Sequence, residues 1–252
     1  MTTPNDVGLD CYLYGIVAAD LVVPANLTGV QNQLVSLAPH GDVAALVSLF
    51  DSEQPLAGRA DLLAHSQVLD AIAAGGPVIP VRFGSIMQDR DTVRSEVLEP
   101  GHDRFRAILG DLEGYSQFTV RARYDERQVL TEIIAENPEI AQLRAATRNR
   151  PDDSSYGERV RLGELVAHAL EAKSAADARA LLTELERHAA AAQIHDSAGL
   201  DRLLDLALLV DNNWRNEFEQ AVEALAESHA GRVRMKLIGP TAPYDFVEEQ
   251  WA

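Results

Sequence analysis

The sequence predicts an α+β protein of two domains, on the basis of three observations. The chain has 252 residues, of which 46% are hydrophobic, so it can bury one large core or two ordinary ones. Short runs rich in aromatic and β-branched residues, which favour strands, recur in both halves. Longer segments with apolar residues at helical spacing lie between them. The two halves repeat a similar order of elements, which favours two domains over one.

The first half is predicted to contain four strands and two helices. Cys11–Val17 is apolar on both alternating faces, as in a strand covered on both sides. A hairpin follows, because Gly41 tolerates a positive φ and Asp42 can cap its own turn. Gly75 and Gly76 end the first helix. In chain order we predict strands at 11–17, 32–38 and 43–50, a helix at 58–74, a strand at 77–84 and a helix at 89–109.

The second half is predicted to be dominated by one long helix. Residues 158–192 are rich in alanine, leucine, glutamate and arginine and contain no proline, a composition typical of helix. Residues 147–157 have the charge, proline and serine content of a mobile loop. Asn212 or Asn213 is expected to cap the last helix. In chain order we predict a strand at 115–124, short helices within 127–146, the loop, the long helix, strands at 193–197 and 203–211, a helix at 212–230 and a strand at 231–239.

This order of elements predicts a specific topology for each half. Strand, helix, strand, strand, helix, strand is the order of the ferredoxin-like fold. The first half resembles it with the first helix replaced by a loop, and the fourth strand then lies at a sheet edge. Pro80, which has no N–H for a β-ladder, is tolerated there. We therefore predict an N-terminal modified ferredoxin-like domain over 1–113 and a C-terminal α+β domain with the long helix and a tail over 114–252.

Charge and hydrophobicity exclude two classes of partner. The net charge is -17 and the isoelectric point is about 4.7, so a phosphate-binding surface is not expected and no nucleic acid is predicted as a partner. The longest apolar runs fall short of the roughly 20 residues that a membrane-spanning helix needs. The N-terminal residues lack the pattern of a secretory signal. We expect a soluble cytoplasmic protein that does not enter a membrane.

The sequence offers little for catalysis or for metal binding. Cys11 is the single cysteine and lies in an apolar strand, where a thiol acts as a small hydrophobe. The seven histidines are scattered singly, and no phosphate-binding glycine loop or Gly-x-Ser-x-Gly motif is present. Asp205 lies between leucines, so it is either a carboxyl with a raised pKa or a residue on the open face of its strand. We predict no catalytic residue, no cofactor, no metal site and no enzyme activity.

Arg82 is the unusual residue of the segment Pro77–Gly84. A guanidinium on an edge strand can bind a carboxylate through two parallel hydrogen bonds. That carboxylate belongs either to a partner protein or to another segment of the same chain, and the residues leave both interpretations open.

The C-terminal segment, 239–252, is also unusual. Gly239, Pro240 and Pro243 end the last strand and favour an extended chain. The tail also carries more large apolar residues than a free tail is expected to have. The segment therefore packs back on its own domain or docks elsewhere. Its large apolar residues are Tyr244, Phe246, Val247 and Trp251.

Five segments in the same order resemble the gas vesicle accessory proteins of the F/L family. The specific ones are the Pro-Val-Arg-Phe-Gly core and the Gly-Pro ending followed by Pro-Tyr-x-Phe. The family commonly has Trp-Pro where this chain has Thr241 and Ala242, which removes one aromatic side chain. The five segments are Tyr12–Val17, Gly41–Ser48, Pro77–Ser85, Leu203–Asp211 and Gly239–Val247.

The resemblance implies a noncatalytic role in building gas vesicles, which are gas-filled buoyancy compartments with a protein shell. It implies a two-domain α+β fold with ferredoxin-like features. It also implies that the partners are the small, hydrophobic major shell protein and other gas vesicle accessory proteins, in the cytoplasm.

Two interaction hypotheses follow for individual residues. Arg82 and Phe83 are expected to orient the surface that meets a shell or accessory protein. The tail from Pro243 to Trp251, with Tyr244, Phe246 and Val247, is expected to dock on a partner. The alternatives are a minor structural component of the shell, or a ferredoxin-like enzyme or ligand-binding protein. The enzyme alternative requires polar groups such as Arg82 and His65 to converge in a pocket.

Overall fold

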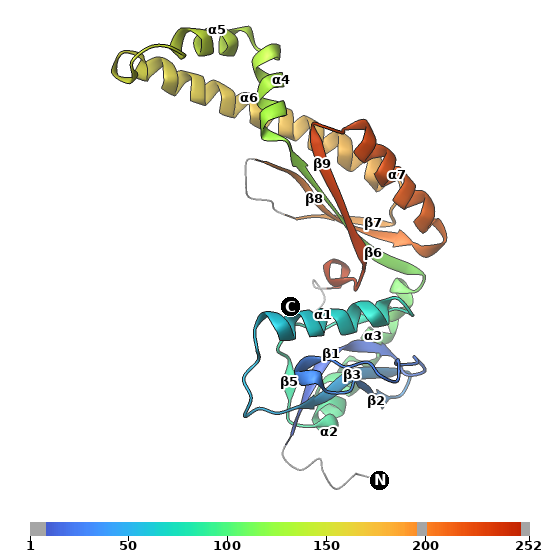
Figure 1. The fold of residues 1–252 in the computed structure, drawn as a ribbon. Helices are drawn as coiled ribbons and strands as arrows, with labels where there is room; N and C mark the ends of the chain where they lie inside the picture. The colour runs from blue at the N-terminus through green and yellow to red at the C-terminus, as the bar shows by residue number, and fades with distance from the viewer. Residues whose placement is uncertain (1–8, 196–200, 248–252) are drawn as a thin grey trace. The chain divides into compact units, whose positions relative to one another are not determined.

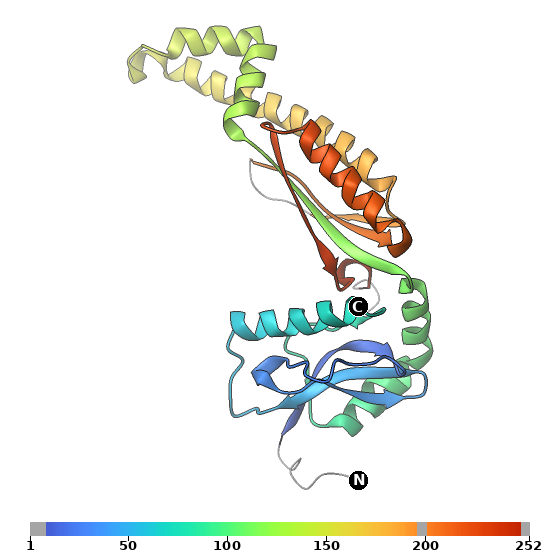
Figure 2. The same ribbon diagram turned by 45° about the vertical axis from the view of Figure 1, so that its right-hand side comes forward.

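The structure is a computed structural model that describes residues 9–195 and 201–247. It contains two antiparallel sheets and several helices (Figures 1 and 2), so the predicted α+β class is confirmed. Contacts divide the chain into two compact units, described separately below. The first unit contains residues up to Phe118, together with 211–213 and the segment from Gly239. The second contains Thr119–Val210 and Trp214–Ile238.

The first unit is built around β1, which is buried on both faces as predicted. The strand order is β2-β3-β1-β4, and β5 pairs with the same edge of β1 as β4 does. Helix α1 lies on one face of this sheet, and α2 and α3 lie on the other (Figure 2). Gly41, at a φ of 58°, forms the turn of the predicted β2–β3 hairpin. The elements are β1 (Asp10–Ala18), η1 (Val30–Asn32), β2 (Ser36–His40), β3 (Val43–Phe50), α1 (Arg59–Ala73), β4 (Ile79–Pro80), β5 (Ile86–Met87), α2 (Arg90–Thr92), η2 (Val93–Leu98) and α3 (Glu99–Leu112).

The predicted strand over 77–84 is much shorter in the structure. Only Ile79 and Pro80 are strand, opposite Ile16 and Gly15 of β1. The N–H of Val81 still donates to the carbonyl of Tyr14 at 2.8 Å, and Ser85 accepts from the N–H of Leu13 at 2.9 Å. Between them the chain bulges out from β1, and Gly84 has a φ of 87°. The expected edge position of Pro80 is confirmed, because β4 is the last strand on its side of β1.

Gly29 is required by the packing of the first unit. A Cβ on Gly29 would lie 2.1 Å from the hydroxyl oxygen of Tyr14. That hydroxyl is buried, accepts a hydrogen bond from the Val30 N–H at 2.8 Å and pairs with Ser48 Oγ at 2.9 Å. An added methyl group would displace it from both partners.

We therefore expect Gly29→Ala to lower the free energy of unfolding by about 2 kcal/mol, through overpacking and the lost hydrogen bonds of Tyr14. Gly110→Ala is the control, because a Cβ there meets nothing within 4 Å and Gly110 lies inside helix α3. The control should be neutral or stabilising. Urea denaturation of both variants tests this, and equal stability of the two would contradict it.

The second unit contains a four-stranded sheet in the order β7-β8-β6-β9. Helices α6 and α7 lie on one face of it (Figure 1), where their buried apolar residues include Leu181, Leu185, Phe218 and Val222. Helices α4 and α5 pack along the first part of α6. The elements are β6 (Tyr115–Tyr124), α4 (Glu126–Glu136), α5 (Pro138–Thr147), α6 (Asp152–Glu186), β7 (Ala191–Ile194), β8 (Arg202–Asp211), η3 (Asn212–Trp214), α7 (Arg215–Ser228), β9 (Val233–Thr241) and η4 (Tyr244–Phe246). Among the described residues, every helix is too short or too polar to span a membrane.

Two predictions for the second half were wrong in detail. The loop expected over 147–157 is short, because helix α6 begins at Asp152, directly after Pro151, and ends at Glu186 rather than near 192. A proline at the start of a helix needs no hydrogen-bond partner for its nitrogen, so it marks a start as readily as a loop. Neither Asn212 nor Asn213 caps α7, since both lie in the 3-10 turn η3 and Trp214 occupies the cap position.

Candidate interaction site

The segment between β4 and β5 is held in place by two buried side chains. His65 Nε2 lies 3.1 Å from the carbonyl oxygen of Val81, which can only accept, so Nε2 carries the proton. Nδ1 then accepts from the Tyr12 hydroxyl at 3.1 Å. That hydroxyl in turn accepts from the N–H of Gly84 at 2.9 Å. The relay joins the backbone at both ends of residues 81–84 to β1 and α1.

Burial keeps this relay in one protonation state. It lowers the pKa of His65 to about 4, although the hydrogen bond to Val81 opposes the shift. It raises the pKa of Tyr12 to about 12. At neutral pH the imidazole is therefore uncharged and the phenol remains a donor. His65 also stacks on the ring of Tyr14, with ring centroids 5.6 Å apart.

Arg82 projects from this anchored segment into solvent. Its side chain is exposed and makes no hydrogen bond or ion pair with any residue of 9–195 or 201–247. Of the two interpretations of the sequence, an internal ion pair is therefore absent from the described structure. Arg82 does not converge with His65, which is buried and fully engaged by its two partners.

Phe83 belongs to the same segment as Arg82 and is half-buried. Its ring contacts His65 edge-on at 5.8 Å and lies 6.4 Å from the ring of Tyr12. It packs against the core of the first unit. Leu62 and Leu63 on α1 and Ile86 on β5 are large apolar residues that remain exposed in this unit. The candidate site therefore combines an exposed guanidinium on a fixed backbone with elements of the same unit that expose apolar side chains.

The tail packs on the first unit, so it does not belong with the second half as predicted from the domain boundary. The N–H of Ala242 donates to Asp70 of α1 at 3.2 Å, and Ala242 is part of the core cluster. Gln117 donates to Asp245 at 2.5 Å and accepts from its N–H at 3.1 Å. The sequence left open whether the tail packs back on the C-terminal domain or docks elsewhere. It packs within the chain, but on the unit that contains α1.

These contacts change what the tail can offer to a partner. Pro243 and Val247 are buried, while Tyr244 and Phe246 are half-buried. Docking of Tyr244 and Phe246 stays a prediction, and Trp251 lies outside the described residues.

The remaining candidates for chemistry are Cys11 and Asp205. Cys11 is buried, and burial raises the pKa of its thiol to about 11. Asp205 lies on its strand facing β6, where its carboxylate accepts from Arg121 Nε at 3.0 Å. No group of three or more histidine, cysteine, aspartate or glutamate side chains suited to a metal ion occurs within the described part of the chain.

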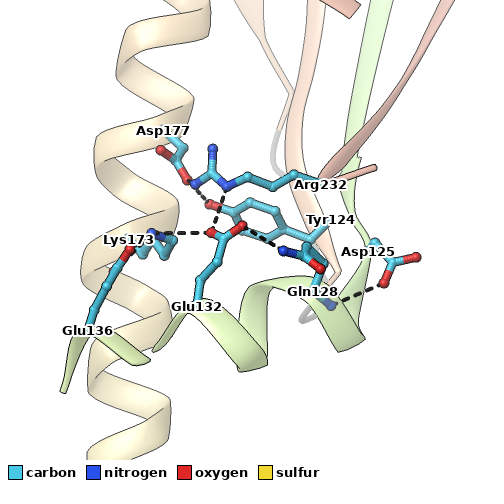
Figure 3. Close-up of polar contacts among 8 residues, drawn as sticks. All are labelled: Tyr124, Asp125, Gln128, Glu132, Glu136, Lys173, Asp177 and Arg232. Carbon is cyan, nitrogen blue, oxygen red and sulfur yellow. Dashed lines mark hydrogen bonds and ion pairs between the residues drawn. The ribbon is translucent and has the colours of Figure 1, made fainter. Parts of the chain in front are cut away.

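A polar cluster that the sequence did not reveal lies in the second unit (Figure 3). Arg232, just before β9, donates to Glu132 of α4 at 2.8 Å and to Asp177 of α6. The guanidinium lies over the ring of Tyr124, 5.7 Å from its centroid. The Tyr124 hydroxyl donates to Asp177 at 2.5 Å. The cluster joins β6, α4, α6 and the start of β9.

In this cluster, burial and the charge of Arg232 shift the pKa of Glu132 in opposite directions. Burial alone would raise the pKa of Glu132, but the hydrogen bond and charge of Arg232 hold it below its usual value. Lys173 adds ion pairs to Glu132 at 3.4 Å and to Glu136 at 3.1 Å. The helical spacing of Glu132 with Glu136, and of Lys173 with Asp177, was the one sequence signal for it.

The fold defines a class, the two-unit α+β proteins, and Arg82 and Phe83 lie between the two edge strands β4 and β5 of the first unit. The chain belongs to the family described as gas vesicle synthesis protein GvpL/GvpF, which it matches over residues 10–248. The resemblance noted in the sequence is thereby confirmed.

Individual relatives agree with this assignment. Gas vesicle protein F of Streptomyces sp. (strain CB03234) is 32% identical over 244 residues, covering 95% of this chain and 100% of that protein. Gas vesicle protein L of the same strain is 30% identical over 256 residues, covering 93% and 91%. The crystal structure of the gas vesicle protein GvpF from Anabaena sp. PCC7120 superposes with a TM-score of 0.77 at 24% identity, covering 94% and 95%. That likeness supports the fold.

Proposed function

We propose that this protein acts in gas vesicle assembly by binding the hydrophobic shell protein and other accessory proteins in the cytoplasm. Its membership of the gas vesicle family supports the setting. One structural observation carries the binding role: Arg82 is exposed and free of ion pairs with described residues, on a segment whose backbone is fixed at both ends by Tyr12 and His65. Because the backbone that carries Arg82 is already held, binding through this side chain requires no further ordering of the backbone, and arginine is among the residues that most often anchor interfaces.

We also infer that each unit is a variant of the ferredoxin-like fold. In the second unit the strand order is second, third, first, fourth along the chain, with helices after the first and third strands. This order supports the predicted βαββαβ topology. The first unit has the same order for its first four strands, with the η1 loop where the first helix would stand.

The proposed role is noncatalytic. A catalytic site needs titratable groups that meet where a substrate can bind. Arg82 and His65, the example given for such a convergence, do not meet, because one is exposed and the other is buried within the relay.

Coexpression with the small shell protein of gas vesicles tests the proposal. We expect the shell protein, when expressed with this chain, to copurify with it in soluble form. The proposal would be contradicted if this chain is recovered alone both when it is coexpressed with the shell protein and when the other accessory proteins are coexpressed as well.

Arg82→Ala should separate binding from stability. Because the side chain has no partner among the described residues, we expect an unchanged melting temperature and about tenfold less shell protein captured. Arg59→Ala is the control, since Arg59 is also exposed and lies in the same unit. Unchanged capture by Arg82→Ala, measured by quantitative pull-down, would remove Arg82 from the interface.

A further inference from the structure

Four cations lie on two neighbouring strands of the second unit. Arg121 and Arg123 are on β6, and Arg234 and Lys236 are on β9. All four are exposed, while Ala122 and Val233 beside them are buried and Met235, between the two cations of β9, is half-buried. The cations therefore point away from the face that α6 and α7 cover. We call these four residues the cation patch.

The register of β6 and β9 places the four cations in two opposed pairs. The Asp125 N–H donates to the carbonyl of Arg232 at 2.8 Å. Near the other end of the ladder, Gly239 approaches Phe118 so closely that a Cβ would lie 2.6 Å from its ring. Both strands cover the same number of residues between these points, so the register does not slip. Arg123 then lies opposite Arg234, and Arg121 lies opposite Lys236.

Like charges directly opposite each other destabilise a sheet. Two of the cations are partly neutralised, since Arg121 reaches Asp205 at 3.0 Å and Arg123 reaches Asp201 at 3.4 Å. Arg234 and Lys236 make no hydrogen bond or ion pair with any residue in the described ranges. Arg234 and Lys236 therefore form a small positive region on a chain whose net charge is -17.

We propose that the cation patch binds an extended acidic segment of a partner protein. Residues two apart on a strand are about 6.6 Å apart, the same spacing as alternate side chains of an extended peptide. Carboxylates at every second position of that peptide can therefore meet Arg234 and Lys236 together, and a guanidinium can bind a carboxylate with two hydrogen bonds. A nucleic acid fits less well, because its affinity rests on many clustered cations and only Arg234 and Lys236 of the patch lack a partner among the described residues.

The patch and the Arg82 site lie in different units, so this proposal stands apart from binding of the shell protein. Either can fail without the other.

A labelled peptide of alternating glutamate and threonine tests the proposal by fluorescence anisotropy with the full chain. We expect salt-dependent binding that weakens at least about tenfold in the double variant Arg234→Gln/Lys236→Gln. The control is Arg127→Gln/Arg144→Gln, which removes the same charge from exposed positions on α4 and α5. The control should bind within about twofold of the unaltered protein.

Folding and alternative partners are measured in parallel. Because the substitutions relieve like-charge repulsion, the melting temperature of the patch variant should stay level or rise, and a fall would assign the pair a structural role.

The proposal is overturned if the unaltered protein does not bind the peptide, or if both double variants weaken binding equally. It is also overturned if a single-stranded oligonucleotide of equal charge binds as tightly. Self-association of the chain that the patch variant abolishes would make a second copy the partner, and would overturn it too.

Discussion

Arg232→Ala is expected to lower the free energy of unfolding of the second unit by about 2 kcal/mol, because it removes the cation that two partly buried carboxylates share. Glu132 keeps its ion pair with Lys173. Glu132 and Asp177 each keep less than a quarter of their side-chain surface exposed, at 22% and 23%. Both face the position that the guanidinium vacates. The variant also removes the cation over the ring of Tyr124.

Hydrogen exchange in α4 and α6 measures this effect within the second unit. Arg187→Ala is the matched control: its ion pair with Glu184 is short, at 2.8 Å, but the arginine is 66% exposed. We expect the control to cost about 0.5 kcal/mol or less. The deficit of Arg232→Ala should shrink in acid, because Arg232 holds the pKa of Glu132 below its usual value and protonation of Glu132 removes the charge that Arg232 stabilises. Equal protection of α4 and α6 in both variants would show that the cluster does not hold these helices to the sheet.

His65 is expected to make the first unit less stable as the pH falls. Its pKa is about 4 in the folded protein and 6.5 in the unfolded chain. Between these values the unfolded chain binds a proton that the folded protein does not, so the free energy of unfolding decreases with decreasing pH. The contribution is fully present above about pH 6.5 and should amount to a loss of about 2 kcal/mol between about pH 7 and about pH 5.

His65→Gln isolates this contribution, because glutamine can donate to Val81 and accept from Tyr12 but does not titrate. Urea denaturation followed by circular dichroism should show that the variant loses about 2 kcal/mol less than the unaltered protein over this range. His168→Gln is the control, since His168 is exposed on α6 and should leave the pH dependence unchanged. Parallel pH profiles for the protein and His65→Gln would mean that His65 is not a buried neutral histidine.

Most of the elements were predictable because their signals are local. Cys11–Val17 and Tyr115–Tyr124 have the composition and alternation of strands, and both strands are present. A glycine with positive φ was expected at Gly41 and is found there. Proline at position 80 predicted a sheet edge, since the missing N–H is a property of the residue itself. The start of α6 was missed because proline and serine mark helix starts as well as loops.

The site was only partly predictable, because its contacts join residues far apart in the chain. The residues around Arg82 in the sequence were enough to mark it as unusual. The relay that holds its backbone joins Tyr12 to His65, which are 53 residues apart in the chain. Nothing local to Arg232 identifies its partner Glu132, which is 100 residues away. Ion pairs of this kind depend on how helices and strands pack, which a pattern within one element does not encode.

The sequence by itself determined the α+β class, the order of the elements and the gas vesicle family, because hydrophobic period, turn residues and ordered motifs are carried by short stretches of chain. The tertiary structure alone decided that Arg82 faces solvent, that the tail packs against α1, and that four cations meet on β6 and β9. Each of these depends on which distant backbone lies alongside, and strand pairing and burial set that only when the whole chain has folded.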